Sequence, residues 1–171
     1  MSRSLLDWLN ENVPDGSKWK QIRKIDISNE SIDSLKGIDE IPNLEEIDCS
    51  FNNLTRLKGL RKHHQLKKFV CRRNYMETLD GIEKLKMLEE LDCSENELKS
   101  INEVKNLKNL KILNCSYNEL TNVSGIGNLS ELVDLKVFGN KIVKLKGVNR
   151  IITRGGVVKE YLFDLENDGY K

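Results

Sequence analysis

The sequence is poor in the residues on which several classes of protein depend. Among 171 residues there are two histidines, two prolines and 6% aromatic residues, and 28 basic against 27 acidic side chains leave a net charge of +1. No stretch approaches the roughly 20 apolar residues of a membrane span, and the N-terminal residues lack the apolar core of a secretion signal. The charge balance gives no overall attraction to nucleic acid or an anionic membrane. We therefore expect a cytoplasmic protein without a membrane span.

Catalytic and cofactor-binding patterns are also missing. The histidines, His63 and His64, are adjacent, and neither an H-E-x-x-H motif nor a C-x-x-C pair occurs. No nucleophile stands beside a base, and no cofactor fingerprint is present. The sequence thus predicts a protein that is not an enzyme and holds neither cofactor nor metal, with His63 as a structural residue at a core position.

A 22-residue repeat organises most of the chain. Apolar residues recur at positions 1, 4, 6, 11, 14, 17 and 20 of each period, as in the coil that begins at Leu88. Positions 4 and 6 alternate with polar neighbours, which predicts a short strand with one buried side, and a glycine at position 16 predicts a tight helical or 3₁₀ return. One coil cannot bury its own apolar side, so successive coils must stack with their strands in parallel. Six coils are predicted, at residues 22–43, 44–65, 66–87, 88–109, 110–131 and 132–153.

Both ends of such a stack expose apolar surface and need a cap. Residues 1–21 predict a helical N-terminal cap, because Ser4 and Asp7 form a capping-box pattern before an apolar run. Residues 154–171 depart from the repeat and are interpreted as a C-terminal cap strand and tail. Within them a turn at the paired glycines is followed by a predicted strand from Val157 to Leu165.

Two polar residue types recur at fixed coil positions. Asparagine occupies position 9 in five coils, where a buried amide must find partners, and we predict that it bonds the turn after each strand. Glu30 replaces it in the first coil. Cysteine occupies position 6 in four coils, and these thiols should form a row about 5 Å apart. A row does not offer zinc its tetrahedral ligand set, so free buried thiols are favoured. The residues concerned are Asn52, Asn74, Asn96, Asn118, Asn140, Cys49, Cys71, Cys93 and Cys115.

These residues resemble the leucine-rich-repeat family. The signature L-x-x-L-x-L/C-x-x-N-x-L is nearly intact in coils two to six. The 22-residue length is similar to that of the short intracellular class that includes a regulatory subunit of protein phosphatase 1, and to the repeats of bacterial internalins. The resemblance implies an α/β fold, a right-handed leucine-rich-repeat solenoid or horseshoe. It further implies a curved parallel β-sheet on the concave side, short helical or 3₁₀ turns on the convex side, and a non-catalytic module that binds a protein partner through its concave face.

Candidate binding residues are those that the repeat does not require. Position 7 is serine in four coils but Arg72 and Phe138 in two others, and large side chains stand at positions 8 and 10. Exposed aromatic and arginine side chains anchor many protein interfaces. At positions 2 and 3, opposite charges alternate between neighbouring strands, and these either neutralise one another or bind a partner. The candidate protein-binding residues are Phe51, Arg72, Arg73, Tyr75, Glu95, Tyr117, Lys136 and Phe138.

Two other functions stay open at this point. The repeat class alone allows a phosphatase-regulatory-like adaptor, although the usual C-terminal cap motif of that family is not recognisable. The basic segment 61–73 allows a nucleic-acid-associated protein, against which the acidic strands on either side and the balanced net charge weigh. We expect a monomer whose partner is a protein of unknown identity.

Overall fold

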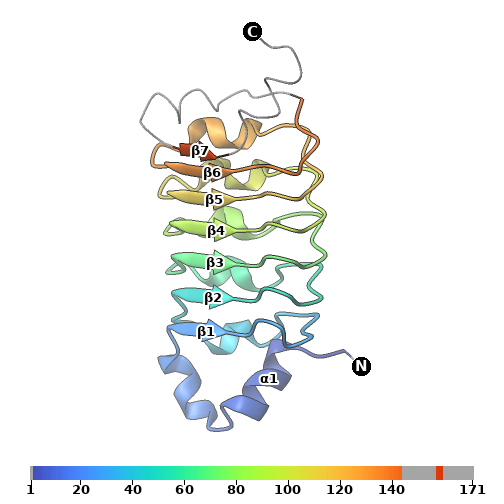
Figure 1. Ribbon diagram of the computed structural model, residues 1–171. Coiled ribbons are helices and arrows are strands. Elements are labelled where there is room, and N and C mark those ends of the chain that lie inside the picture. The colour runs from blue at the N-terminus through green and yellow to red at the C-terminus, as the bar shows by residue number, and fades with distance from the viewer. Residues whose placement is uncertain (1, 144–156, 160–171) are drawn as a thin grey trace.

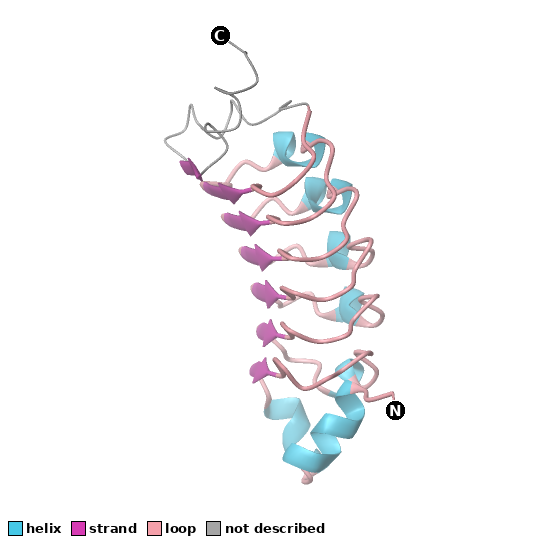
Figure 2. Ribbon diagram, turned by 45° about the vertical axis from the view of Figure 1, so that its right-hand side comes forward, coloured by secondary structure: helices cyan, strands magenta, loops and turns pink. Residues whose placement is uncertain are grey.

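The computed structural model describes residues 2–143 and 157–159. Within them, seven short parallel strands form one sheet in chain order. The strands run up one side of a stack of coils (Figure 1), and 3₁₀ turns line the other side (Figure 2). The predicted stacking of parallel strands is confirmed. The strands are β1 Lys24–Asp26, β2 Glu46–Asp48, β3 Lys68–Val70, β4 Glu90–Asp92, β5 Ile112–Asn114, β6 Asp134–Lys136 and β7 Val157–Lys159.

The strand register follows the sequence repeat. From β1 to β6 each strand residue lies opposite the residue at the same position of the next coil, so that Ile25 faces Ile47 and Leu91 faces Leu113. One continuous core fills the space between the sheet and the 3₁₀ turns, and Phe69 is its largest fully buried side chain. Equivalent apolar side chains of successive coils lie against one another, so the burial of each coil depends on its neighbours.

The return segments are 3₁₀ turns, as the glycines at position 16 predicted. Gly37, Gly59 and Gly81 precede the first three turns with φ of 101°, 94° and 107°, a backbone region that glycine enters without steric cost. Glu103 holds this position in the fourth coil, and there the turn begins at coil position 15 instead of 17. Gly125 at this position in the fifth coil does not have a positive φ, and it lies within the 3₁₀ turn. The turns are η2 Ile38–Glu40, η3 Leu60–Lys62, η4 Ile82–Lys84, η5 Asn102–Asn106 and η6 Ser124–Asn128.

A helix covers the N-terminal end of the stack. It is α1, Leu5–Asn12, followed by the 3₁₀ turn η1, Gly16–Gln21. The predicted capping box is present, because the Ser4 hydroxyl accepts from the Asp7 N–H while the Asp7 carboxylate accepts from the Ser4 N–H. Leu5 and Leu9 are fully buried against the first coil. The helix therefore provides the apolar cover that the first coil requires.

At the other end, β7 continues the parallel sheet. Val158 lies opposite Leu135, so the step from β6 to β7 is one residue longer than the repeat. The strand predicted from Val157 to Leu165 is seen over its first three residues, and residues 160–171 lie outside the described part of the chain. We propose that the chain consists of an N-terminal cap, six coils and a C-terminal cap, with the bounds predicted from the sequence.

The asparagines at position 9 bond the turn after each strand, as predicted, and they also bond the backbone of the preceding coil. In the fourth coil the Asn96 amide nitrogen donates to the carbonyl oxygens of Cys71, Cys93 and Ser94 at 3.1–3.2 Å, and its oxygen accepts from the Met76 N–H at 3.1 Å. Each amide thus shapes its own turn and ties it to the preceding coil. In the first coil the Glu30 carboxylate instead accepts from Arg3 at 2.9 Å. The other asparagines in the same arrangement are Asn52, Asn74, Asn118 and Asn140.

The four cysteines form a buried row of free thiols. Each sulfur lies 3.3–3.5 Å from a carbonyl oxygen of the next coil, as Cys49 does from Val70. Burial raises the pKa of all four thiols, that of Cys115 to about 12. In the described residues, no group of three or more histidine, cysteine, aspartate or glutamate side chains is placed to hold a metal ion. The row therefore consists of small apolar core groups.

We expect no cysteine to react with a neutral thiol reagent in the native protein. The thiolate is the reactive form, and the four cysteine side chains are buried and stay protonated. The protein unfolded in guanidinium chloride should react at all four cysteines. Counting labels by mass spectrometry before and after denaturation measures this difference. Labelling of the native protein at a rate independent of denaturant would contradict the buried row.

Candidate protein-binding site

On the N-terminal half of the sheet, the alternating charges are paired with one another. Lys24 lies 2.6 Å from Glu46, and Lys67 lies 2.9 Å from Glu45. The hydrogen bond between the latter two lowers the pKa of the Glu45 carboxyl and raises that of the Lys67 ammonium. The neutralisation that the sequence left open is therefore present at positions 2 and 3. Further pairs on this face are Arg23–Glu45, Lys68–Glu90 and Lys111–Glu89.

The character of the sheet changes at β5. Ile112 at coil position 3 and Val133 at coil position 2 stand where coils one to four have charged residues, and they are 39% and 49% exposed. Asn114 replaces the aspartate found at position 5 of coils one, two and four, and it donates to the Asp92 carboxylate at 3.0 Å. Lys136, opposite Asn114 in the register, has no ion pair with any residue that the structure describes. Among the described residues, the C-terminal half of the sheet thus has fewer ion pairs, and β6 carries both an unpaired carboxylate, Asp134, and an unpaired ammonium, Lys136.

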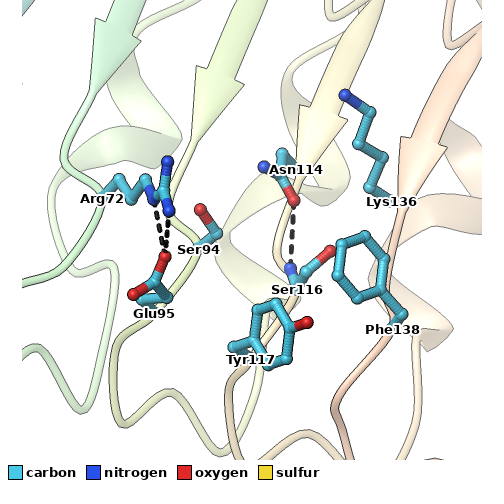
Figure 3. A pocket seen from close by; sticks show the side chains of 8 residues that line it. All are labelled: Arg72, Ser94, Glu95, Asn114, Ser116, Tyr117, Lys136 and Phe138. Atoms are coloured by element: carbon cyan, nitrogen blue, oxygen red, sulfur yellow. Dashed lines mark hydrogen bonds and ion pairs between the residues drawn. The ribbon is translucent and has the colours of Figure 1, made fainter.

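A hollow of about 360 Å³ opens where β3 to β6 end. Figure 3 shows Arg72 and Glu95 on one side of it and Tyr117 and Phe138 on the other, with Lys136 beyond them. Five of the eight candidate residues therefore surround one space. The lining residues are Arg72, Ser94, Glu95, Asn114, Ser116, Tyr117, Lys136 and Phe138.

The polar side of the hollow is a guanidinium held from two directions. The Arg72 Nε donates to Glu95 Oε1 at 2.7 Å, and its Nη2 contacts the same oxygen. The guanidinium carbon also lies 5.5 Å from the ring centre of Phe51, and that of Arg73 lies 5.4 Å from the same centre. Cation–π contacts of this kind restrict both arginines. Phe51, Arg72 and Arg73 therefore form one cluster, and Arg72 is the member of it that also lines the hollow.

The apolar side of the hollow is an aromatic pair. The rings of Tyr117 and Phe138 meet edge to face with centres 4.9 Å apart. The Tyr117 ring also uses the space beside Gly139, where a Cβ atom would lie 2.3 Å from Tyr117 Cδ1. Tyr117 is nevertheless 55% exposed. The pair thus presents an open apolar surface whose position depends on the absence of a side chain at Gly139.

The floor of the hollow was not predicted as part of the site. Ser94 donates from its N–H and hydroxyl to Asp92 at 3.0 and 2.6 Å. Ser116 donates its N–H to the Asn114 oxygen at 3.2 Å, but its buried hydroxyl oxygen has no hydrogen-bond partner among the described residues. The sequence feature that could have pointed to this floor is Asn114, which stands where coils one, two and four have aspartate. Tyr75, a candidate residue, is 55% exposed but does not line the hollow.

The rim of the hollow has an unusual backbone. Every residue at position 8 has a positive φ of 53–65°, a region that asparagine and glycine enter with least strain and that costs other residues about 1–2 kcal/mol. Phe51, Arg73, Glu95 and Tyr117 nevertheless hold it in the four central coils. Their N–H groups donate to carbonyl oxygens of the following coil, as Tyr117 does to Phe138 at 2.8 Å. The stacking of the coils therefore imposes a positive φ at position 8, whatever the side chain at that position.

Replacing Arg73 with glycine should leave the free energy of unfolding unchanged or raise it by up to about 1 kcal/mol, because glycine relieves the left-handed strain. Replacing Arg73 with valine should lower it by about 1–2 kcal/mol, because a β-branched residue resists a positive φ. Urea denaturation of the two variants beside the parent makes the comparison. Equal stability of the two would show that the backbone here is not strained.

The basic segment 61–73 does not form one basic surface. Lys62 pairs with Asp39 at 3.1 Å, and Lys68 pairs with Glu90 at 2.8 Å. His63 is 1% exposed, with its Nε2 3.0 Å from the Ile38 carbonyl oxygen, so the prediction of a structural histidine is confirmed. The segment starts in the 3₁₀ turn η3 and ends beyond β3. Its charges are divided between two sides of the coil.

Comparison with known proteins supports the repeat assignment. Residues 86–128 match the family model described as leucine-rich repeats in two copies. InlF, an internalin of Listeria monocytogenes, has a TM-score of 0.71 and 20% identity, covering 77% of this chain and 38% of its own. A leucine-rich-repeat protein of Leptospira interrogans has a TM-score of 0.65 and 28% identity over 70% of this chain and 32% of its own. No curated protein matched.

A third similar structure is the functional domain of InlJ from Listeria monocytogenes, which includes a cysteine ladder. Its TM-score is 0.52 at 23% identity, covering 75% of this chain and 35% of the InlJ chain. The chain thus spans about a third of the length of these three proteins. Its fold is that of a leucine-rich-repeat solenoid, and residues 86–128 match the repeats of that family. This fold commonly serves protein interaction. No helix in residues 2–143 is long and apolar enough to cross a membrane.

Proposed function

We propose that this chain is a non-catalytic module that binds a protein partner on the strand side of the solenoid, the concave side of its family, around the hollow at the strand ends. The observation that carries the proposal is the arrangement around that hollow. Arg72, Tyr117 and Phe138 converge on one space, although the repeat requires a large side chain at none of their positions. Arginine and aromatic side chains in such hollows are frequent centres of binding energy.

The physical cost of this arrangement supports a role in binding. Tyr117 is held at a φ of 53° with more than half of its surface exposed, so that neither backbone strain nor solvent exposure favours a tyrosine there. Glycine stands at the same coil position in Gly139 without disturbing the turn. The large side chains on the rim are therefore not explained by the stability of the stack.

Affinity purification with the tagged chain tests the proposal. The parent is compared with a triple variant in which Arg72, Arg73 and Tyr117 become alanine, and with a control variant in which alanine replaces three other exposed residues. A partner that the parent and the control retain equally, and that the triple variant loses, is the expected result. A partner retained equally by all three proteins would place the binding surface elsewhere. The control residues are Arg56, Lys58 and Met87.

The same purification bears on the narrower alternatives. A phosphatase-regulatory-like adaptor should co-purify a phosphatase catalytic subunit, and this alternative is dropped in its absence. A nucleic-acid-associated protein should be retained on heparin and released by salt, which the divided charges of segment 61–73 disfavour. The proposed cytoplasmic location accords with four free thiols, and cell fractionation tests it.

A further inference from the structure

Two hollows of opposite unbalanced charge lie on the same sheet. Beside the hollow already described, a second one of about 250 Å³ is formed over β1 to β3. Among its lining residues Lys24 pairs with Glu46, and Lys68 pairs with Glu90. Asp26 and Asp48 remain, and within the described residues neither makes an ion pair.

The two aspartates lie side by side in the sheet. Asp26 is opposite Asp48 in the register, and each accepts a hydrogen bond from the backbone N–H two residues later, at 2.9 and 2.8 Å. The hydrogen bond from Ser28 lowers the pKa of the Asp26 carboxyl, so that this group stays ionised. Like charges on neighbouring strands repel each other. A cation placed above them would therefore be stabilised by both.

Among the residues that line the other hollow, the excess charge has the opposite sign. The Arg72 guanidinium is balanced by Glu95. Among the described residues, Lys136 has no ion pair and the Ser116 hydroxyl has no hydrogen-bond partner. Position 5 is aspartate in coils one, two and four, uncharged in coils three and five, and lysine only in coil six. The row consists of Asp26, Asp48, Val70, Asp92, Asn114 and Lys136.

We infer that the sheet binds one extended segment of a partner protein across its strands, with a basic residue over Asp26 and Asp48 and an acidic residue beside Lys136. An aromatic or large aliphatic residue next to that acidic residue packs against Tyr117 and Phe138. At about 4.8 Å between strands, β1 and β6 are about 24 Å apart, which an extended segment of about seven residues spans. The inference rests on the proposed function and adds to it the chemistry and direction of the partner.

A random peptide library tests this inference. Peptides of roughly 12 residues, long enough for the span, are displayed on phage and selected on the full chain, and the enriched peptides are synthesised with a fluorescent label. We expect them to carry a basic residue at one end and an acidic residue beside an aromatic or aliphatic one at the other. Fluorescence anisotropy then gives their dissociation constants for the parent and the variants.

Three variants separate the two ends of the site. Lys136→Glu should weaken binding at least about tenfold, because charges brought together in an interface repel strongly, and a peptide with lysine in place of its acidic residue should recover affinity. The double variant Asp26→Asn/Asp48→Asn should weaken binding about fivefold or more, while asparagine can keep the turn hydrogen bond, as Asn114 does. Lys105→Glu, a matched charge change at an exposed residue of η5, should have no effect.

The possible failures are distinguishable. Peptides that depend on Tyr117 but tolerate Lys136→Glu would overturn the inference and leave the proposed function intact. Insensitivity to the double aspartate variant would overturn the bridging of the two hollows. Enriched peptides that tolerate loss of Tyr117, Arg72 and Lys136 alike would overturn both proposals, as would the absence of any enriched peptide. Self-association that Lys136→Glu abolishes would identify a second copy as the occupant and also overturn the inference.

Discussion

Replacing Asn96 with alanine should lower the free energy of unfolding by about 3 kcal/mol, the upper end of the cost of leaving a buried polar group unpaired. The Asn96 side chain makes four hydrogen bonds to the backbone of two successive coils. The alanine variant removes the acceptor of the Met76 N–H and a shared donor for three carbonyl oxygens. Because these groups lie between stacked coils, water cannot easily replace the lost amide. Urea denaturation followed by circular dichroism measures the change.

Two control variants separate the loss of hydrogen bonds from general disturbance of the fourth coil and its neighbours. Asn53→Ala removes an exposed asparagine from the equivalent turn of coil two and should change stability by less than about 0.5 kcal/mol. Cys93→Val keeps a similar apolar volume next to Asn96 and should cost less than about 1.5 kcal/mol. Val137 already occupies the same coil position in coil six. An Asn96→Ala variant as stable as these controls would show that the amide is not needed for stacking.

The fold was predictable because its determinants repeat. Each core position recurs six times, so a single substitution such as Phe69 for leucine does not obscure the pattern. A buried amide can be satisfied only by the backbone of its own turn and its neighbour, which made the role of Asn96 predictable as well. The one-residue shift before β7 was not predictable, because the paired glycines near it leave the length of that connection open.

The candidate site was predictable only where it departs from the repeat. Arg72 and Phe138 stand out because serine is usual at their coil position. Ser116 and Gly139 were missed because both are ordinary residues of the turn, and only the structure shows that one hydroxyl lacks a partner. It also shows that a ring fills the space beside Gly139.

The partner of Arg72 also depended on three-dimensional detail. From the sequence, its charge could be neutralised by the aspartates of neighbouring strands, but its position beyond the strand end directs it to Glu95 in the following coil. Phe51 lies against the guanidinium groups, whereas Tyr117, at the same coil position, turns towards Phe138 instead. When several neighbours are about equally near, the one that a side chain contacts cannot be predicted from the spacing of residues along the chain.

Replacing Arg72 and Arg73 together with alanine should weaken partner binding by at least about 2 kcal/mol, the scale of residues that dominate an interface. Both guanidinium groups lie against Phe51, and Arg72 lines the hollow. A planar group there can hold a carboxylate of the partner with two hydrogen bonds. The same change should alter the free energy of unfolding by less than about 1 kcal/mol, because the pair with Glu95 is partly exposed and such pairs contribute little.

Titration calorimetry with the partner recovered by affinity purification, beside urea denaturation of the same variants, measures both quantities. The variant with lysine at both positions provides the control, because it keeps the charge and loses the planar group; it should bind more weakly than the parent and more tightly than the alanine variant. Binding by the alanine variant equal to that of the parent would remove the two arginines from the interface. A large loss of stability with unchanged affinity would assign them to the stack, where Arg72 holds Glu95 and both guanidinium groups cover Phe51.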